Sequence, residues 1–164
     1  MLNATTNLTF ESAAAASLAL KPDAPLFCFS APQLQARARI FLKGFPGNVT
    51  FAVKANSSLA ILQLMAQSGV GADIVSSGEL KRSLLAGIPP ERIVFSGVGK
   101  TEAEMAEALD AGVGRFNVES FDELEALQRV AGGRKTIACA AVRINPDVDA
   151  RTHQKISTGK SDNK

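Results

Sequence analysis

The sequence predicts an α/β protein in which parallel strands alternate with helices, as in the first part of a (β/α)8 barrel. Short runs rich in β-branched and aromatic residues alternate with amphipathic stretches of helical period. From the second run onward the runs recur about every 22 residues, the length of one strand–helix unit. Such alternation with short connections indicates parallel strands covered by helices, either in a barrel or in a doubly wound sheet. The regular repeat, without a long connection, favours the barrel.

Six runs have the composition of strands. They are Leu26–Phe29, Val49–Val53, Asp73–Ser76, Arg92–Phe95, Arg115–Val118 and Thr136–Ile144. The first run precedes the repeat, so we assign residues 1–30 to an N-terminal segment and residues 31–164 to a barrel portion with about five strands. A complete barrel takes about 250 residues. The 164 residues are therefore expected to be part of something larger.

Capping signals mark both ends of the predicted helices. Four strand-to-helix junctions carry the capping-box pattern, in which a hydroxyl accepts from the first turn while a Glu or Gln reaches back: Ser30/Gln33, Ser76/Glu79, Thr101/Glu104 and Ser120/Glu123. Gly69, Gly87 and Gly112 follow helical stretches at positions where a left-handed residue would end a helix.

Composition narrows the classes of function. The net charge of +2 is spread along the chain, and Trp and Tyr are absent, so we expect neither nucleic-acid nor membrane binding. Cys28 and Cys139 lie in apolar runs and are expected to be buried thiols of a reducing cytoplasm. Two cysteines and one histidine are too few for a zinc site. No stretch has the pattern of a signal peptide or of a spanning helix.

The segment Ser96–Thr101 has the end of a phosphate-binding P-loop but not its beginning. The motif GxxxxGK[ST] requires glycine at position 94, where the chain has valine. Residues 157–161 fail in the same way, because Gln154 occupies the first glycine position. We therefore expect no nucleotide hydrolysis, and we interpret Gly97 and Gly99 as part of a tight turn after a strand.

Lys54 interrupts the apolar end of a predicted buried strand, in the segment FAVKAN at 51–56. Burial lowers the pKa of a lysine amine, and an amine at a strand end is suited to form a Schiff base with an aldehyde. The alternative is a lysine whose stem packs at the strand end while its charge stays in water.

Several segments together carry a resemblance to a known family. They are FAVKAN at 51–56, GADIVSSGEL at 71–80, IVFSGVGKT at 93–101, FNVES at 116–120, RINPDVD at 143–149 and THQKISTG at 152–159. The chain from about residue 23 onward resembles the diaminopimelate decarboxylases, a branch of the fold-type III pyridoxal-phosphate enzymes. That resemblance implies a (β/α)8 barrel followed by a C-terminal β-domain, which is absent from this truncated sequence. The strand within residues 1–30 would join that β-domain.

The resemblance also implies roles for individual residues. Lys54 matches the Schiff-base lysine that binds pyridoxal 5'-phosphate, and Asp73 and Glu79 match carboxylates beside the cofactor and the lysine. Glu79 could equally be a capping residue for Ser76. Arg143 matches an arginine near the cofactor, and its alternative is an ion pair with a carboxylate on a neighbouring strand. His153 is interpreted as a loop residue, and the roles of residues 157–159 stay open.

The implied reaction is the decarboxylation of meso-diaminopimelate to L-lysine by a cytoplasmic homodimer that acts on a small amino acid. Family segments that hold the cofactor's phosphate and ring have no counterpart in the 164 residues, so we expect this chain alone to be inactive. An open partial barrel is expected to aggregate or to be marginally stable. Two alternatives remain: another fold-type III enzyme, such as an ornithine or arginine decarboxylase or an alanine racemase, and a non-enzymatic binding protein.

Overall fold

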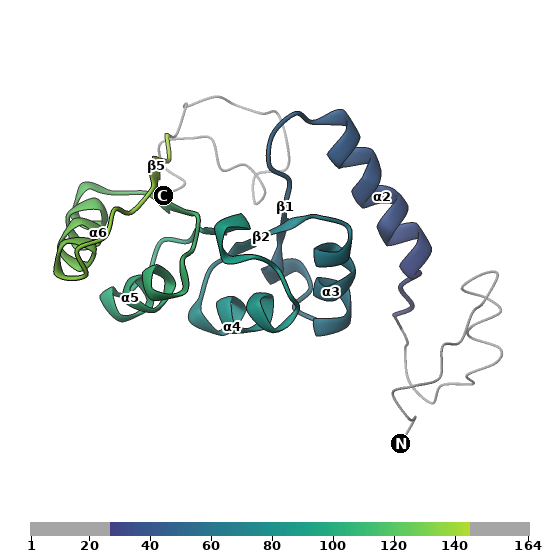
Figure 1. Ribbon diagram of the computed structural model, residues 1–164, viewed down its shortest axis with the longest axis horizontal. Helices are drawn as coiled ribbons and strands as arrows, with labels where there is room; N and C mark the ends of the chain where they lie inside the picture. Colours follow the sequence, from purple (N-terminus) through teal and green to yellow (C-terminus); the bar gives the residue numbers. More distant parts are fainter. Residues whose placement is uncertain (1–26, 145–164) are drawn as a thin grey trace, which may run out of the picture.

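The computed structural model describes residues 27–144 (Figure 1). Five strands form one parallel sheet: β1 (Thr50–Ala52), β2 (Gly71–Ile74), β3 (Ile93–Phe95), β4 (Arg115–Val118) and β5 (Ala140–Val142). The helices are α2 (Ala31–Gly44), α3 (Leu59–Gln67), α4 (Ser77–Leu85), α5 (Glu102–Ala111) and α6 (Phe121–Gly133), with short 3-10 turns η1 (Val53–Ala55) and η2 (Pro90–Arg92). His153 and residues 157–159 lie outside the described residues.

The strand order distinguishes the two architectures that the sequence left open. The order in the sheet is β1-β2-β3-β4-β5, and every pair is parallel. A doubly wound sheet reverses its order at a switch point, whereas a barrel adds each strand beside the previous one. Because successive crossovers are right-handed, α3 to α6 lie along the same side of the sheet (Figure 1). The described chain therefore has the architecture of the first part of a barrel.

The predicted strands are found with changed bounds. The strand Arg115–Val118 is confirmed as it stands, and the runs at 49–53 and 92–95 contain β1 and β3. The strand predicted at Asp73–Ser76 begins two residues earlier, at Gly71, and ends at Ile74, because Ser76 is the N-cap of α4. Of the long run Thr136–Ile144, only the three residues of β5 pair with β4.

The strand predicted at Leu26–Phe29 is wrong for its described residues. Residues 27–30 have no regular secondary structure, and Phe27 and Phe29 are exposed. A strand needs a partner to satisfy its backbone groups, and no described strand lies beside this segment. The assignment of residues 1–30 to a separate segment stays a prediction.

The helix caps follow the predicted pattern in part. Thr101 and Glu104 form the complete box, whereas Ser76 and Ser120 each accept from the third residue of their helix. In these two junctions the glutamate accepts from the N–H of the residue before the N-cap. Glu79 accepts from Val75 at 2.8 Å, and Glu123 accepts from Glu119 at 2.7 Å. Ser30 makes no side-chain cap, and that prediction is wrong.

Glycines at two kinds of position are required by the backbone. Gly69, Gly87 and Gly112 have φ of 78°, 85° and 82°, so the predicted left-handed helix ends are confirmed. At the start of β4 the constraint is space, because a Cβ on Gly114 would lie 2.1 Å from the carbonyl oxygen of Glu91. Gly97, with φ of 99°, lies in the turn predicted after β3.

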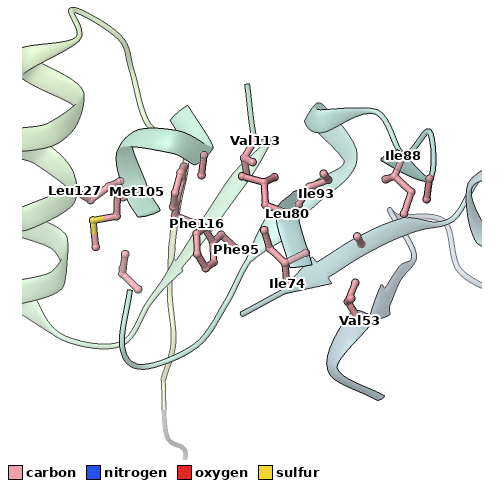
Figure 2. Packing of buried hydrophobic residues seen from close by; sticks show 14 of the residues in the cluster. Val53, Ile74, Leu80, Ile88, Ile93, Phe95, Met105, Val113, Phe116 and Leu127 are labelled. Atoms are coloured by element: carbon pink, nitrogen blue, oxygen red, sulfur yellow. The ribbon is translucent and has the colours of Figure 1, made fainter. Parts of the chain in front are cut away.

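The main core lies between the sheet and helices α3 to α6 (Figure 2). Strand residues alternate across the sheet, so Ile74, Phe95 and Phe116 are fully buried while Asp73, Val94 and Asn117 face the other side and are half-buried. The rings of Phe95 and Phe116 pack with their centroids 6.1 Å apart. A smaller cluster of Ala38, Met65 and Val70 fixes α2 against α3. The apolar residues therefore leave the opposite face of the sheet to polar groups.

Both cysteines differ from the prediction of buried thiols. Cys28 and Cys139 are free and exposed. Cys28 lies in the segment without regular structure, and Cys139 precedes β5, which has only one neighbouring strand in the described chain. An apolar run buries its residues only where a second element covers it.

Truncation of Phe116 is expected to destabilise the fold far more than the same truncation of Phe121. Phe116→Ala removes a fully buried ring and should lower the free energy of unfolding by about 3–5 kcal/mol. Phe121 is 86% exposed, and Phe121→Ala should change it by about 0.5 kcal/mol or less. Urea denaturation followed by circular dichroism measures both. Equal effects of the two variants would contradict the described core.

Candidate functional site

The carboxyl ends of all five strands lie at one edge of the sheet, and the candidate residues lie at or just beyond these ends. Lys54 follows β1 in the turn η1. The register pairs Ala52 with Asp73, which places Lys54 two residues past the position opposite that carboxylate. Arg143 follows β5, and its N–H bonds Val118 O at 2.8 Å. In barrels this edge is where active sites are built.

Lys54 is exposed, and within the described residues it makes no hydrogen bond or ion pair. The burial expected from its place at a strand end is therefore not found. The loop that follows is held in place, because Asn56 Oδ1 accepts from Ser58 N at 3.0 Å and Arg82 donates to Ser57 O at 3.3 Å. The site thus offers an uncommitted amine on a supported turn.

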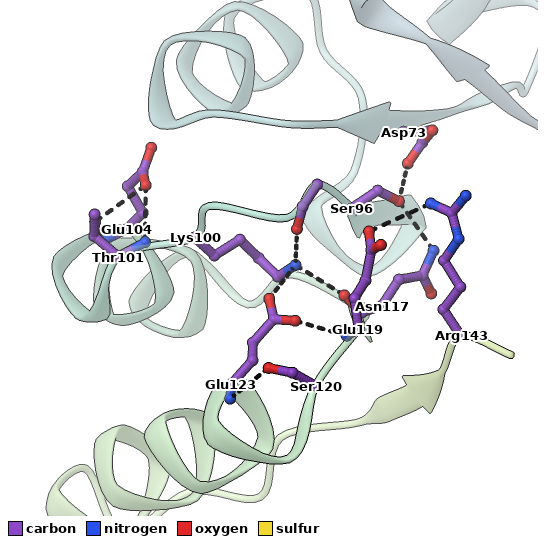
Figure 3. A network of polar contacts seen from close by, with 11 residues as sticks. Asp73, Ser96, Lys100, Thr101, Glu104, Asn117, Glu119, Ser120, Glu123 and Arg143 are labelled. Atoms are coloured by element: carbon purple, nitrogen blue, oxygen red, sulfur yellow. Dashed lines mark hydrogen bonds and ion pairs between the residues drawn. The ribbon is translucent and has the colours of Figure 1, made fainter. Parts of the chain in front are cut away.

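Asp73 belongs to a row of three polar side chains from adjacent strands. The hydroxyl of Ser96, directly after β3, donates to Asp73 Oδ1, and the amide of Asn117 on β4 donates to Ser96 Oγ at 2.9 Å (Figure 3). All three residues are half-buried on the face of the sheet opposite the main core. The row brings one carboxylate, one hydroxyl and one amide together at the strand edge.

A buried lysine lies next to this row. The side chain of Lys100 is 1% exposed, and its Nζ donates to the carbonyl oxygens of Gly97 at 2.6 Å and Asn117 at 2.8 Å (Figure 3). Glu123 Oε1, on α6, lies 2.5 Å from the same nitrogen. The Phe95 ring lies beneath it, with its centroid 5.8 Å from Nζ. A buried ammonium needs such partners, and these connect the turn after β3 to β4 and α6.

Glu79 has a structural role in the described chain. Its Oε2 accepts from the N–H of Val75, and Ser83 donates its hydroxyl to Glu79 O at 2.8 Å. The carboxylate therefore holds the turn between β2 and α4, just beyond Asp73. Among the described residues, no hydrogen bond or ion pair joins Glu79 to Lys54.

Arg143 forms the ion pair that was its alternative role. Its Nη1 lies 3.4 Å from Glu119 Oε1, at the end of the neighbouring strand β4. The arginine side chain is 46% exposed, whereas that of Glu119 is 10% exposed. The pair leaves a large part of the guanidinium open to other anions at the same edge.

The four predicted residues share an edge of the sheet but form no hydrogen bond or ion pair with one another in the described chain. Sequence reasoning missed Ser96, Asn117 and Lys100. Ser96 and Lys100 were noticed only as part of a failed P-loop, and Asn117 only as part of a motif. Their places at the ends of consecutive strands were a usable signal, because side chains in such places meet at one edge.

The cap of α5 also connects neighbouring units. Glu104 accepts from the N–H groups of Thr101 and Ser77, at 3.1 and 3.3 Å. These hydrogen bonds, first that from Thr101, hold the pKa of Glu104 below its ordinary value. The carboxylate thereby connects the first turns of α5 and α4.

No helix in the range 27–144 is long and apolar enough to cross a membrane. The same residues contain no group of three or more His, Cys, Asp or Glu side chains that could bind a metal ion.

Comparison with known proteins gives a consistent set of matches. The family described as "Pyridoxal-dependent decarboxylase, pyridoxal binding domain" matches residues 32–164. The diaminopimelate decarboxylase of Zymomonas mobilis is 54% identical over 146 residues, which are 85% of this chain and 35% of that protein. The crystal structure of the Helicobacter pylori diaminopimelate decarboxylase complexed with L-lysine matches with a TM-score of 0.82 and 41% identity, over 90% of this chain and 38% of that one. An arginine decarboxylase of Paramecium bursaria Chlorella virus matches with a TM-score of 0.65 and 26% identity, over 73% and 32%. The chain spans roughly a third of the length of these proteins.

Removal of the Lys100 charge is expected to destabilise the fold strongly. Lys100→Met leaves Glu123 buried without its cation and two carbonyls without a donor, and should lower the free energy of unfolding by about 3–5 kcal/mol. The matched control is Lys81→Met, which breaks the exposed pair with Glu107 and should have a much smaller effect. The double variant Lys100→Met/Glu123→Leu should lose less than the single variant. Equal losses for Lys100→Met and Lys81→Met in urea denaturation would contradict this role.

The cap formed by Glu104 is expected to weaken in acid. Because its pKa is lowered in the fold, its contribution is fully present above the ordinary value of 4.5 and is lost as pH falls through the lowered value. Glu104→Gln keeps a hydrogen-bond acceptor and loses only the charge at the helix N-terminus, so it should destabilise by about 0.3–1 kcal/mol at pH 7 and by less at acidic pH. Glu125→Gln, an exposed change on α6, is the control. A pH-independent difference between parent and Glu104→Gln would show that the charge has no part in the cap.

Proposed function

The chain belongs to the pyridoxal-dependent decarboxylase family, and from this premise we propose that it supplies the lysine-bearing part of an enzyme that converts meso-diaminopimelate to L-lysine. Two comparisons support this substrate. The relative that is 54% identical is a diaminopimelate decarboxylase, and a solved relative is complexed with L-lysine, the amino acid that remains when one carboxylate leaves diaminopimelate. Identity to the viral arginine decarboxylase is much lower, at 26%.

The described residues fit pyridoxal 5'-phosphate as the cofactor. The observation that carries the proposal is the uncommitted amine of Lys54 on a supported turn, at the same edge as the half-buried carboxylate of Asp73. When bound, pyridoxal phosphate supplies an aldehyde that binds amines and a ring that accepts the electron pair left by a departing carboxylate. Lys54 would hold the aldehyde carbon, as an accessible amine can.

The other predicted residues would provide charge around that amine. Asp73 uses Oδ1 for Ser96, and among the described residues nothing occupies Oδ2, which would accept from a cationic nitrogen. Arg143 would offer a fixed positive charge to the substrate or cofactor with the open part of its guanidinium. Glu79 remains a predicted neighbour of the lysine. Its carboxylate accepts from the N–H of Val75 and so holds the turn that follows Asp73.

Assembly and location are proposed on the resemblance. We propose that the enzyme acts as a homodimer in the cytoplasm on a small amino acid. Two free, exposed cysteines are compatible with a reducing compartment, where thiols stay unpaired. Sedimentation of the enzyme would separate a dimer from a monomer.

Covalent trapping tests the cofactor and the lysine. When this chain, joined to the remaining part of the Zymomonas mobilis enzyme, is incubated with pyridoxal phosphate and reduced with borohydride, mass spectrometry of the digest should find the cofactor's mass on the peptide that contains Lys54. Lys54→Arg should abolish this adduct, whereas Lys43→Arg, at an exposed lysine of α2, should leave it unchanged. Random labelling of exposed lysines, with Lys54 no more reactive than Lys43, would contradict the assignment.

A chimera tests the substrate. The matched segment of the Zymomonas mobilis enzyme is replaced by this chain, and carbon dioxide release is measured with meso-diaminopimelate, arginine and ornithine. We expect release from diaminopimelate that Lys54→Ala abolishes. Preference for arginine or ornithine would instead indicate another decarboxylase of the family. A folded chimera that binds pyridoxal phosphate but decarboxylates none of the three would contradict an enzymatic role.

A further inference from the structure

Ser96 stands between two partners that restrict how it can bond. Its oxygen accepts from Asn117 Nδ2 at 2.9 Å, and its hydroxyl donates to Asp73 Oδ1. A serine hydroxyl has a single proton. Because the Asn117 amide already points a donor at Ser96, the serine proton is directed to Asp73 (Figure 3). The Asn117 amide on β4 thus determines that the Asp73 carboxylate on β2 accepts a hydrogen bond from Ser96.

Lys100 holds the backbone at the other two members of this row, Ser96 and Asn117. One hydrogen bond of its ammonium goes to the carbonyl of Gly97, the residue after Ser96, and another goes to the carbonyl of Asn117 itself. The ammonium is buried and paired with Glu123, whose side chain is only 10% exposed. A buried charge with three partners has little freedom to move. The backbone next to Ser96 and the backbone of Asn117 are therefore held at a fixed distance from each other.

We propose that Ser96 and Asn117 are positioning residues, which hold the Asp73 carboxylate in one orientation at the strand edge, and that Lys100 anchors both of them. The effect of this positioning on Lys54 rests on the proposed function. With Oδ1 bound by Ser96, Oδ2 is the oxygen left to face the amine of Lys54 or the nitrogen that replaces it. The alternative is a hydrogen-bond row that only joins β2, β3 and β4.

Two measurements separate these roles. The first is made without cofactor: the carboxyl-carbon chemical shift of Asp73 at pH 7, assigned by its loss in Asp73→Asn. Ser96→Ala and Asn117→Leu should both move this signal, and Ser96→Thr, which keeps the hydroxyl, should restore it. Ser68→Ala is the matched control, because it also removes a half-buried serine hydroxyl with one hydrogen bond, to Leu64 O at 2.8 Å.

The second measurement is the rate of borohydride trapping of pyridoxal phosphate on Lys54 as a function of pH, made in the chimera with the Zymomonas mobilis enzyme. Ser96→Ala should slow trapping about tenfold near pH 7 and change the profile as Asp73→Asn does. The double variant should match Asp73→Asn alone, because Ser96 acts only through that carboxylate. Ser68→Ala should leave the profile unchanged.

The outcomes distinguish the two proposals. An Asp73 signal that does not move in folded Ser96→Ala and Asn117→Leu overturns the positioning role. So does a moved signal with an unchanged trapping profile in Ser96→Ala. Additive effects of Ser96→Ala and Asp73→Asn overturn it as well. If the parent chimera is not trapped at Lys54, the proposed function fails, while the Asp73 signal still decides whether Ser96 and Asn117 hold the carboxylate.

Discussion

Parallel pairing of each strand with the next strand in the sequence is the constraint on which the rest of this structure depends. The pairing puts every carboxyl end at one edge and every connecting helix on one side of the sheet. It also fixes the register, so that Ala52 lies opposite Asp73 and Asp73 opposite Val94. Residues about one strand–helix unit apart in the sequence thereby become neighbours across the sheet, and Lys54, Asp73, Ser96, Asn117 and Arg143 come to share one edge.

The alternation of side chains across the sheet divides the structure by chemistry. One face buries Ile74, Phe95 and Phe116 under the helices, and this packing carries most of the hydrophobic stabilisation. The other face holds Asp73 and Asn117, which alternate with these apolar residues along their strands. Both are half-buried, so their hydrogen bonds are strengthened by the lower dielectric while the side chains keep some contact with water. The core therefore acts on function indirectly, by holding the backbone that spaces the polar row.

Lys100 shows how a charge can be both a structural element and a determinant of the site. Its burial is costly unless all its donors find partners, and the turn carbonyl, the strand carbonyl and the Glu123 carboxylate meet that need. These bonds hold the turn after β3 in place, next to Ser96, whose hydroxyl donates to Asp73. A single buried cation thus couples the stability of the β3–α6 region to the geometry of a carboxylate on the neighbouring strand β2.

The sequence by itself determined the alternation of strands and helices, the glycine-ended helices and the Thr101/Glu104 cap, because these follow from local period, conformational preference and hydrogen bonding over a few residues. It also carried Lys54 and the family resemblance. Tertiary structure alone decided that residues 27–29 form no strand, that Cys28 and Cys139 are exposed, and that Arg143 pairs with Glu119, since each depends on what lies beside the segment. The Asp73–Ser96–Asn117 row and the burial of Lys100 likewise join residues 17 to 23 positions apart, and only strand pairing brings such residues within hydrogen-bonding distance.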